Sequence, residues 1–214
     1  MSKNLADYRK SYEKGELLEG EIPVNPFELF SKWFTEVELA GGVEEANAMT
    51  VSSIGADGFP KSRIVLLKGY SEQGFVFYTN YNSEKGKAII DNPKVSISFF
   101  WPNLERQVII KGEALKLPEQ LSVNYFNKRP RGSQIGAWAS NQSEQISSRE
   151  DLSERVEEFE KKFEGMSIPK PEHWGGFIVK AVSIEFWQGR PNRLHDRMLY
   201  SLKLNNWISN RLAP

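Results

Sequence analysis

The sequence predicts a mainly β fold with helical additions, in which short antiparallel strands form a small barrel. Runs of β-branched and aromatic residues recur at close spacing, and Gly, Asp and Pro residues separate them. Segments with helical periodicity are inserted between these runs. The 214 residues, 39% of them hydrophobic, are enough for one core. We predict an N-terminal arm or helix over residues 1–20 and a single domain over residues 21–214.

Four segments predict helices. In the first, Asn25 can cap and Pro26 suits the first helical position. In the last, Ser147 and Glu150 have the spacing of a capping box. The predicted helices span residues 24–42, 83–93, 118–130 and 147–165.

The predicted strands follow from apolar and aromatic runs bounded by turn residues such as the Asp57-Gly58 pair. We expect an antiparallel meander at the start of the barrel. The predicted strands lie within residues 48–54, 61–70, 75–81, 94–102, 106–117, 175–189, 193–202 and 206–214.

Composition excludes several classes of function. The 28 basic residues balance the 28 acidic residues, so no net charge attracts nucleic acid or an anionic membrane. The absence of cysteine excludes disulfides and thiolate chemistry, and two histidines make a metal site unexpected. The polar N-terminal segment contains no apolar run typical of a signal peptide. We therefore expect a cytoplasmic protein that binds neither nucleic acid nor membrane.

Two groups of residues are candidates for binding a phosphate. Tyr125 and Arg129 lie four apart on a predicted helix, hence on one face, and Ser133 follows after a turn. Together they would make a phosphate clamp. Arg63 and Lys68 lie five apart on a predicted strand, so they should face opposite ways and meet different parts of a ligand. The alternatives are an ordinary amphipathic helix end and two solvated strand ends.

A further group of candidate site residues lies in the segment from Ser183 to Met198, SIEFWQGRPNRLHDRM. Arg193, His195 and Arg197 alternate, so on a strand they would share a face with the parity of Trp187. Such a basic row beside a tryptophan favours a phosphorylated aromatic ligand, with His195 as a donor or proton-transfer group. An exposed solvated strand is the alternative. The polar segment 140–148 is either a loop that binds a polar cofactor or a plain surface loop.

Several motifs together resemble those of the pyridoxamine 5'-phosphate oxidases. They are RIVLLKGY, FYTNYNSEKGKA, YFNKRPRGSQIGAWAS followed by NQS, IEFWQGRPNRLHDRM and the terminal RLAP. The resemblance runs from YRKSYEKGEL to Pro214.

The resemblance implies an FMN-binding split β-barrel that forms a homodimer with FMN at the subunit interface. It implies oxidation of pyridoxamine 5'-phosphate or pyridoxine 5'-phosphate to pyridoxal 5'-phosphate, a reaction of vitamin B6 metabolism. A hydride would pass from substrate C4' to flavin N5, and O2 would be reduced to H2O2.

The resemblance also implies roles for individual residues. The catalytic residues would be Arg193 and His195. The FMN contacts would be Arg63, Ile64, Val65, Leu66, Leu67, Lys68, Tyr78, Thr79, Lys85, Gln107, Gln142, Ser143, Trp187 and Arg197. The substrate contacts would be Arg9, Tyr12, Lys68, Tyr125, Arg129, Ser133, Arg193 and His195.

One departure concerns the cofactor. Glu84 stands where the family commonly has a basic residue that contacts the FMN phosphate. We expect the Glu84 carboxylate to point away from that phosphate.

Three other functions remain open. They are another flavin-binding split-barrel enzyme (flavin reductase-like or deazaflavin-dependent), a non-catalytic pyridoxal phosphate carrier or FMN sensor, and a nucleic-acid-binding barrel. The first would lack the full RLHDR and YFNKRPRGS set, the second would not need both Arg193 and His195, and the third would need a basic stripe.

Overall fold

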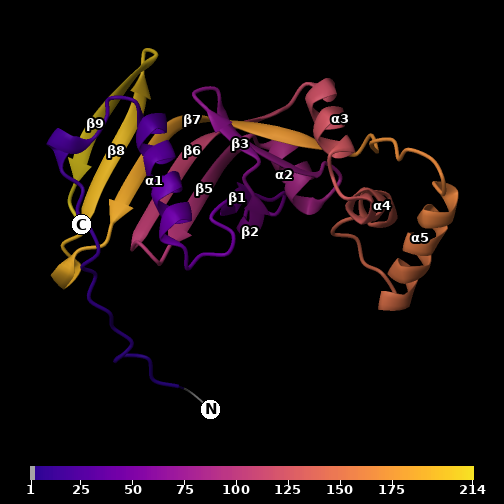
Figure 1. The fold of residues 1–214 in the computed structure, drawn as a ribbon, viewed down its shortest axis with the longest axis horizontal. Helices are drawn as coiled ribbons and strands as arrows, with labels where there is room; N and C mark the ends of the chain where they lie inside the picture. The colour runs from indigo at the N-terminus through magenta and orange to yellow at the C-terminus, as the bar shows by residue number, and fades with distance from the viewer. Residues whose placement is uncertain (1–2) are drawn as a thin grey trace. The chain divides into compact units, whose positions relative to one another are not determined.

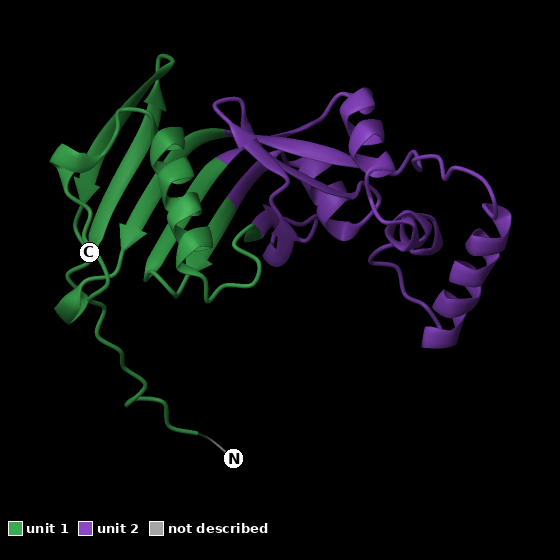
Figure 2. Ribbon diagram, viewed as in Figure 1, with its two compact units in different colours: residues 1–49, 97–111, 181–214 green, residues 50–96, 112–180 purple. Residues whose placement is uncertain are grey.

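The computed structural model describes residues 3–214, which form two compact units that interleave along the chain (Figure 2). Unit 1 comprises the described residues up to Met49 together with 97–111 and 181–214. Unit 2 comprises 50–96 and 112–180. Both units therefore depend on segments that are distant in sequence. The predicted boundary between an arm (1–20) and a domain (21–214) stays a prediction.

The strands lie in or near the predicted segments, and the mainly β class is confirmed (Figure 1). Two segments differ: the predicted strand over 61–70 divides into two strands, and the one over 193–202 begins only at Asp196. Their order in the sheet is β2-β1-β5-β6-β7-β4-β3, and β8 pairs with both β7 and β9. Their bounds are β1 (Ala48–Ile54), β2 (Pro60–Leu66), β3 (Gly69–Ser71), β4 (Gly74–Asn80), β5 (Lys94–Trp101), β6 (Arg106–Lys116), β7 (Trp174–Gln188), β8 (Asp196–Lys203) and β9 (Asn206–Leu212).

Three of the predicted helices begin within two residues of their predicted starts, and Asn25 caps the first of them as expected. Asn25 Oδ1 accepts from the Phe27 N–H at 3.0 Å, and Ser83 Oγ accepts from the Gly86 N–H at 3.2 Å. These helices are α1 (Pro26–Ala40), α2 (Glu84–Asp91) and α3 (Glu119–Asn127).

The end of unit 2 departs from the sequence prediction. A further helix, α4 (Arg131–Ala139), occupies a segment for which no helix was expected. The predicted capping box of α5 (Arg149–Lys162) is wrong by one residue, because Ser148 rather than Ser147 caps the helix. Ser148 Oγ accepts from the Asp151 N–H at 3.2 Å and donates to its carboxylate at 3.1 Å. Single-turn 3-10 helices complete the structure at Glu19–Glu21 (η1) and Pro191–Arg193 (η2).

Unit 1 has an aromatic core between α1 and the strand segments of this unit. Phe30 packs edge-to-face on Phe99 at 5.3 Å between ring centroids, and Trp33 does so on Phe186 at 5.2 Å. All four side chains are buried. Each such pair contributes roughly 0.5–1.5 kcal/mol beyond the burial of its area.

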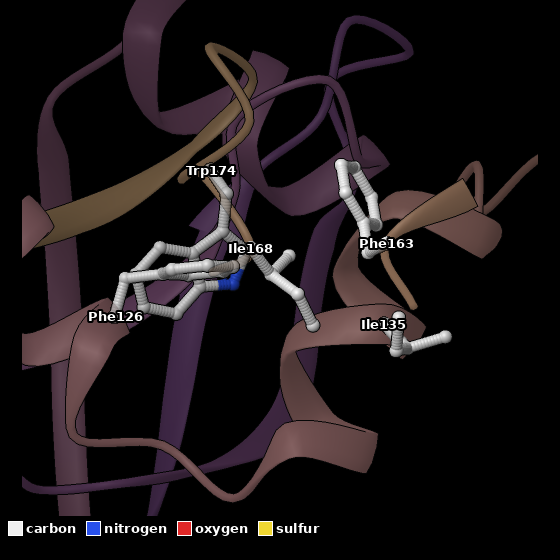
Figure 3. Close-up of a cluster of buried hydrophobic side chains, with 5 residues drawn as sticks. All are labelled: Phe126, Ile135, Phe163, Ile168 and Trp174. Atoms are coloured by element: carbon white, nitrogen blue, oxygen red, sulfur yellow. The ribbon is translucent and has the colours of Figure 1, made fainter. Parts of the chain in front are cut away.

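Unit 2 has a second apolar cluster where α3, α4 and α5 meet the start of β7 (Figure 3). Phe126 packs edge-to-face on Trp174 at 5.2 Å, and α4 lies beside α5. The buried members of the cluster are Phe126, Ile135, Phe163, Ile168 and Trp174. This packing fixes α3 and α4 next to the strands that line the cavity described below. From residue 3 onward, no helix combines the length and apolar character that crossing a bilayer requires.

Candidate functional site

Unit 2 contains a cavity of about 690 Å³. Strands β2 and β4, the first turn of α2, helices α3 and α4 and the loop after α4 contribute its walls. Its lining residues are Lys61, Arg63, Ile64, Val65, Leu66, Lys68, Tyr78, Thr79, Asn80, Glu84, Lys85, Tyr125, Arg129, Ser133, Gly136, Ala137, Ser140, Gln142, Ser143 and Trp174.

Lys85 is a buried cation on this cavity. The first turn of α2 approaches the end of β4 so closely that a Cβ on Gly86 would lie 2.4 Å from the Tyr81 carbonyl oxygen. This approach leaves Lys85 only 9% exposed, with its Nζ donating to Thr79 Oγ1 and, at 3.4 Å, to Gln142 Oε1. Burial and then the nearby charge of Arg63 lower the pKa of Lys85 to about 8. Within residues 3–214, Lys85 has no carboxylate partner to offset this cost.

Arg63 adds a second positive charge from β2. Its Nη1 donates to Ser53 Oγ at 2.8 Å and to the Lys61 carbonyl at 2.6 Å, which fix the guanidinium on neutral acceptors. Burial lowers the pKa of Arg63, and Glu84 partly opposes this effect. Two cations held by neutral groups favour binding of an anion, because an anion is the missing counter-charge.

A stack of aromatic rings forms another wall. The Tyr78 and Tyr125 rings lie 4.0 Å apart at 13°, and Tyr78 lies 5.4 Å from Trp174 at 8°. The Arg129 guanidinium lies over the Trp174 ring at 4.7 Å. Burial lowers the pKa of Arg129. Its Nη1 is buried and has no hydrogen-bond partner in the described part of the chain. A ligand acceptor would satisfy this donor.

Glu84 also lines the cavity, and its carboxylate accepts from Lys61 Nζ at 2.6 Å. The side chains of Lys61 and Glu84 are 58% and 50% exposed, so the pair is solvated and weak. Glu84 therefore places a carboxylate on the cavity wall that Lys61 offsets only weakly. The expectation that it points away from a phosphate stays a prediction.

Unit 1 contains a separate cluster around His195. The His195 ring lies 4.6 Å from Trp187 and 5.8 Å from Tyr12. His195 Nδ1 accepts from the Arg190 N–H at 3.1 Å, so in neutral His195 the proton is on Nε2. Burial and then the charge of Arg193 lower the pKa of His195, and Asp196 raises it in part. His195 is therefore neutral at pH 7, with Nε2–H as a donor.

The prediction that Arg193, His195 and Arg197 share a strand face is wrong. Arg193 ends η2 with φ 63°, and β8 begins only at Asp196, so only Arg197 lies on the strand. Asn192 is also left-handed, with φ 57°, which prolongs the turn after Pro191. Arg197 pairs across the sheet with Trp187 and binds Glu185 at 2.8 Å, while Arg193 is exposed.

Two predictions in unit 2 rest on an element that is shorter than expected, although the residues concerned do meet at one cavity. Because β2 ends at Leu66, Lys68 lies beyond the strand, and Arg63 and Lys68 line the same cavity. Because Pro130 follows, α3 ends at Asn127, and Arg129 lies beyond it. Tyr125 and Arg129 nevertheless both line the cavity.

The structure divides the predicted site residues between the two units. Those that line the cavity of unit 2 are Arg63, Ile64, Val65, Leu66, Lys68, Tyr78, Thr79, Lys85, Tyr125, Arg129, Ser133, Gln142 and Ser143. Leu67 is in unit 2 but is buried in the core. Those in unit 1 are Arg9, Tyr12, Gln107, Trp187, Arg193, His195 and Arg197. Arg9 is exposed, and its Nε donates to the Ala6 carbonyl at 3.1 Å.

Trp174 and Lys61 are among the cavity residues that sequence reasoning missed. Trp174 stacks on Tyr78, and the Arg129 guanidinium lies over the Trp174 ring. Lys61 forms an ion pair with Glu84. A tryptophan directly before Gly175-Gly176, at the start of a predicted strand, was the available indication for Trp174. No pattern in the sequence distinguished Lys61 from other surface lysines.

Comparison with known proteins identifies the family. Residues 35–163 match the family model described as pyridoxamine 5'-phosphate oxidase, and residues 174–214 match the pyridoxine 5'-phosphate oxidase C-terminal dimerisation region. The chain belongs to the pyridoxamine 5'-phosphate oxidase family. A pyridoxine/pyridoxamine 5'-phosphate oxidase of Flavobacterium psychrophilum is 59% identical over 99% of this chain and 100% of its own length. The enzyme of the same name from Flavobacterium johnsoniae is 60% identical over 98% and 99%.

Solved structures confirm the split-barrel fold that the resemblance to pyridoxamine 5'-phosphate oxidases implies. PhzG from Burkholderia lata, crystallised with tetrahydrophenazine-1-carboxylic acid, has a TM-score of 0.87 at 25% identity, covering 94% of this chain and 100% of its own. A pyridoxamine 5'-phosphate oxidase-related, FMN-binding protein from Nostoc punctiforme has a TM-score of 0.71 at 14% identity, covering 90% and 100%.

Proposed function

We propose that this member of the pyridoxamine 5'-phosphate oxidase family oxidises pyridoxamine 5'-phosphate or pyridoxine 5'-phosphate to pyridoxal 5'-phosphate with FMN. The observation that carries the proposal is a cavity that combines stacked aromatic rings with buried Lys85 and half-buried Arg129, neither of which has a carboxylate partner within residues 3–214. Such a cavity suits flat aromatic ligands that carry a phosphate. The names of relatives at 59% and 60% identity support the same substrates.

The residues of the cavity fit FMN. Lys85 and Arg63 are proposed to hold its phosphate, because both are cations fixed by neutral acceptors. Thr79, Gln142 and Ser143 offer hydroxyl and amide groups on the same cavity. When bound, FMN would supply two-electron oxidation: the flavin would take up the hydride from substrate C4' at N5, and O2 would take the electrons to give H2O2.

The protein's own contribution is to bind and orient the substrate. Lys68, Tyr125, Arg129 and Ser133 are proposed to bind the substrate phosphate, and the unpartnered Nη1 of Arg129 supports this role. Arg193 and His195 are proposed as the catalytic residues at the reacting end. Neutral His195 offers its Nε2–H as a donor there. Holding the reacting atoms in contact lowers the barrier by up to about 7–11 kcal/mol.

We propose a homodimer with FMN at the subunit interface. The family model over residues 174–214 is described as a dimerisation region, and it includes β8 and β9. Leu194, Leu204 and Ile208 are exposed apolar side chains in this region, which a partner subunit would cover. The cytoplasmic location stays a prediction.

An anaerobic absorbance titration tests the function. Protein loaded with FMN is mixed with pyridoxamine 5'-phosphate, and the oxidised flavin band is followed. Bleaching that air reverses, with formation of pyridoxal 5'-phosphate, is the expected result. Bound FMN that the substrate does not bleach would favour a carrier or sensor instead. Failure to bind FMN would contradict the assignment of Lys85 and Arg63.

A further inference from the structure

Glu105 is a buried carboxylate in the turn between β5 and β6. It is 2% exposed, and its φ of 56° is left-handed, a conformation that residues with a side chain seldom adopt. Its carbonyl oxygen accepts from the Gly189 N–H at 2.8 Å, which ties the turn to the end of β7. A strained, buried acid held in this way points to a role for its side chain.

The Glu105 side chain binds the N-terminal segment of the chain, residues 10–19, here called the strap. Oε2 accepts from the backbone N–H groups of Glu13 at 2.7 Å and Lys14 at 3.0 Å. Oε1 pairs with Lys10 Nζ at 3.2 Å. Burial raises the pKa of Glu105, but these bonds, led by the Lys14 N–H, outweigh it and keep the pKa below its usual range. The carboxylate is therefore ionised at neutral pH and accepts charge-assisted hydrogen bonds.

From Lys10 to Leu18 the strap has neither helix nor strand, so side chains of unit 1 supply its hydrogen bonds. Besides Glu105, Asp196 accepts from the Leu17 N–H at 3.1 Å, and Arg190 donates to the Gly15 carbonyl at 3.1 Å. These additional contacts hold the C-terminal part of the strap. Glu105 is the anchor for the part around Tyr12.

Tyr12 lies between the strap residues that Glu105 binds. Its ring is 5.7 Å from Trp187 and 5.8 Å from His195. A Cβ on Gly189 would lie 2.8 Å from Tyr12 Cβ, so the strap lies directly on the backbone there. Gly189 thus contacts both partners: its N–H binds the Glu105 carbonyl, and Tyr12 packs against its backbone.

We propose that Glu105 is a positioning residue, which holds the strap so that Tyr12 stays against His195 and Trp187 when substrate arrives. The effect on turnover rests on the proposed function, whereas the effect on the strap does not. Substrate binding then avoids the cost of ordering the strap. Releasing the strap raises the apparent Kd for substrate by the inverse of the fraction of strap that is still in place.

Hydrogen–deuterium exchange of the purified full-length protein tests the anchor. A peptide covering residues 8–18 is compared in the wild type, Glu105→Ala, Glu105→Gln and the control Glu38→Ala, an exposed acid on α1. We expect exchange at least about tenfold faster in Glu105→Ala, because tenfold is the factor for losing one of its charge-assisted bonds. We expect an intermediate rate in Glu105→Gln and no change in the control. Unchanged exchange in Glu105→Ala would overturn the proposal.

A second pair of variants covers the case in which Glu105→Ala does not fold. Lys14→Pro removes the N–H that donates to Glu105 and leaves the carboxylate in place, whereas Lys14→Met keeps that N–H. Both also lose the bond from Lys14 Nζ to the Asn103 carbonyl. Faster exchange in Lys14→Pro than in Lys14→Met supports the anchor, and equal exchange contradicts it.

Steady-state kinetics with pyridoxine 5'-phosphate tests the consequence for substrate. We expect Glu105→Ala to raise KM by the inverse of the fraction of strap that stays in place, which is about tenfold if one tenth does, with a smaller change in kcat and with FMN retained. A loosened strap with unchanged KM would overturn the positioning role. If the wild type shows no turnover, the proposed function fails, and the exchange experiment still decides whether Glu105 anchors the strap.

Discussion

Replacing Lys85 with methionine is expected to stabilise the protein without FMN and to weaken its binding of FMN. Lys85 is buried, and among the described residues its Nζ donates to Thr79 and Gln142. Burial and the charge of Arg63 lower its pKa from 10.5 to about 8. The folded protein therefore carries a cation that it disfavours, and an anionic ligand removes that disadvantage.

The magnitude follows from the pKa of Lys85. A lowering from 10.5 to about 8 corresponds to a cost of about 3 kcal/mol in the charged form. Methionine keeps the length of the side chain but leaves the Thr79 and Gln142 groups without their donor, which costs about 1–2 kcal/mol. The net stabilisation of the apo-protein is about 1–2 kcal/mol, or roughly 2–8 °C in Tm for a chain of this size. Loss of a charge-assisted bond to phosphate weakens FMN binding by about 10- to 100-fold.

The stabilisation expected from Lys85→Met depends on pH. Below pH 8 Lys85 is charged in both folded and unfolded protein, so the full cost of burial applies. As pH rises from about 8 towards 10.5, the folded protein loses this proton before the unfolded protein does, and the cost disappears. The stabilisation by Lys85→Met should thus be largest at pH 7 and fade above pH 8.

Thermal unfolding of the apo-proteins and fluorescence titration with FMN measure the two effects. Lys87→Met is the matched control, because Lys87 lies on the same helix and is exposed. A Lys85→Met protein that is less stable than the wild type without FMN, or that binds FMN with unchanged affinity, would refute the reasoning.

Three further predictions concern the cavity, the histidine and the core. Glu84→Gln should tighten FMN binding by about two- to fivefold, the size expected for half-exposed charges, and weaker binding in a fluorescence titration would contradict this. Below the lowered pKa of His195, kcat/KM should fall by about tenfold per pH unit, because protonation removes the acceptor for the Arg190 N–H. A His195→Asn variant that keeps the same acid limb would exclude a role for neutral His195. Phe126→Ala should lower the free energy of unfolding by about 3–5 kcal/mol in a denaturant titration, against about 0.5 kcal/mol or less for Leu121→Ala, which is 49% exposed on the same helix.

The sequence identifies elements best where local chemistry decides them. Asn25 caps α1 and Ser83 caps α2, and both are polar residues placed directly before a helical pattern. Helix α4 was missed because Gly132 and Gly136 lower its intrinsic helix propensity. Packing of Ile135 in the cluster beside α5 supplies the stability that the local sequence lacks. Such tertiary packing cannot be seen in a window of the sequence.

For the site, too, the sequence predicted the types of residue better than their arrangement. The types of residue in the clamp, such as Arg129 and Lys68, indicated phosphate, but β2 and α3 end earlier than expected, so neither residue lies on the element predicted for it. Likewise, Asn192 and Arg193 have left-handed backbones, which a strand does not accommodate, and β8 therefore begins at Asp196 instead of residue 193. The sequence shows which side chains are available for the site. The direction in which each side chain points depends on the residue at which its strand or helix ends.

The burial of Lys85 could not be predicted from its neighbours in sequence, because it depends on the close approach of Gly86 to the end of β4. That approach costs stability in the absence of ligand, since it holds a cation without a counter-charge. A fold selected for stability alone would place a methionine or leucine at residue 85. The presence of lysine there, together with the unpartnered Nη1 of Arg129, is therefore best explained by anions that complete the structure when they bind.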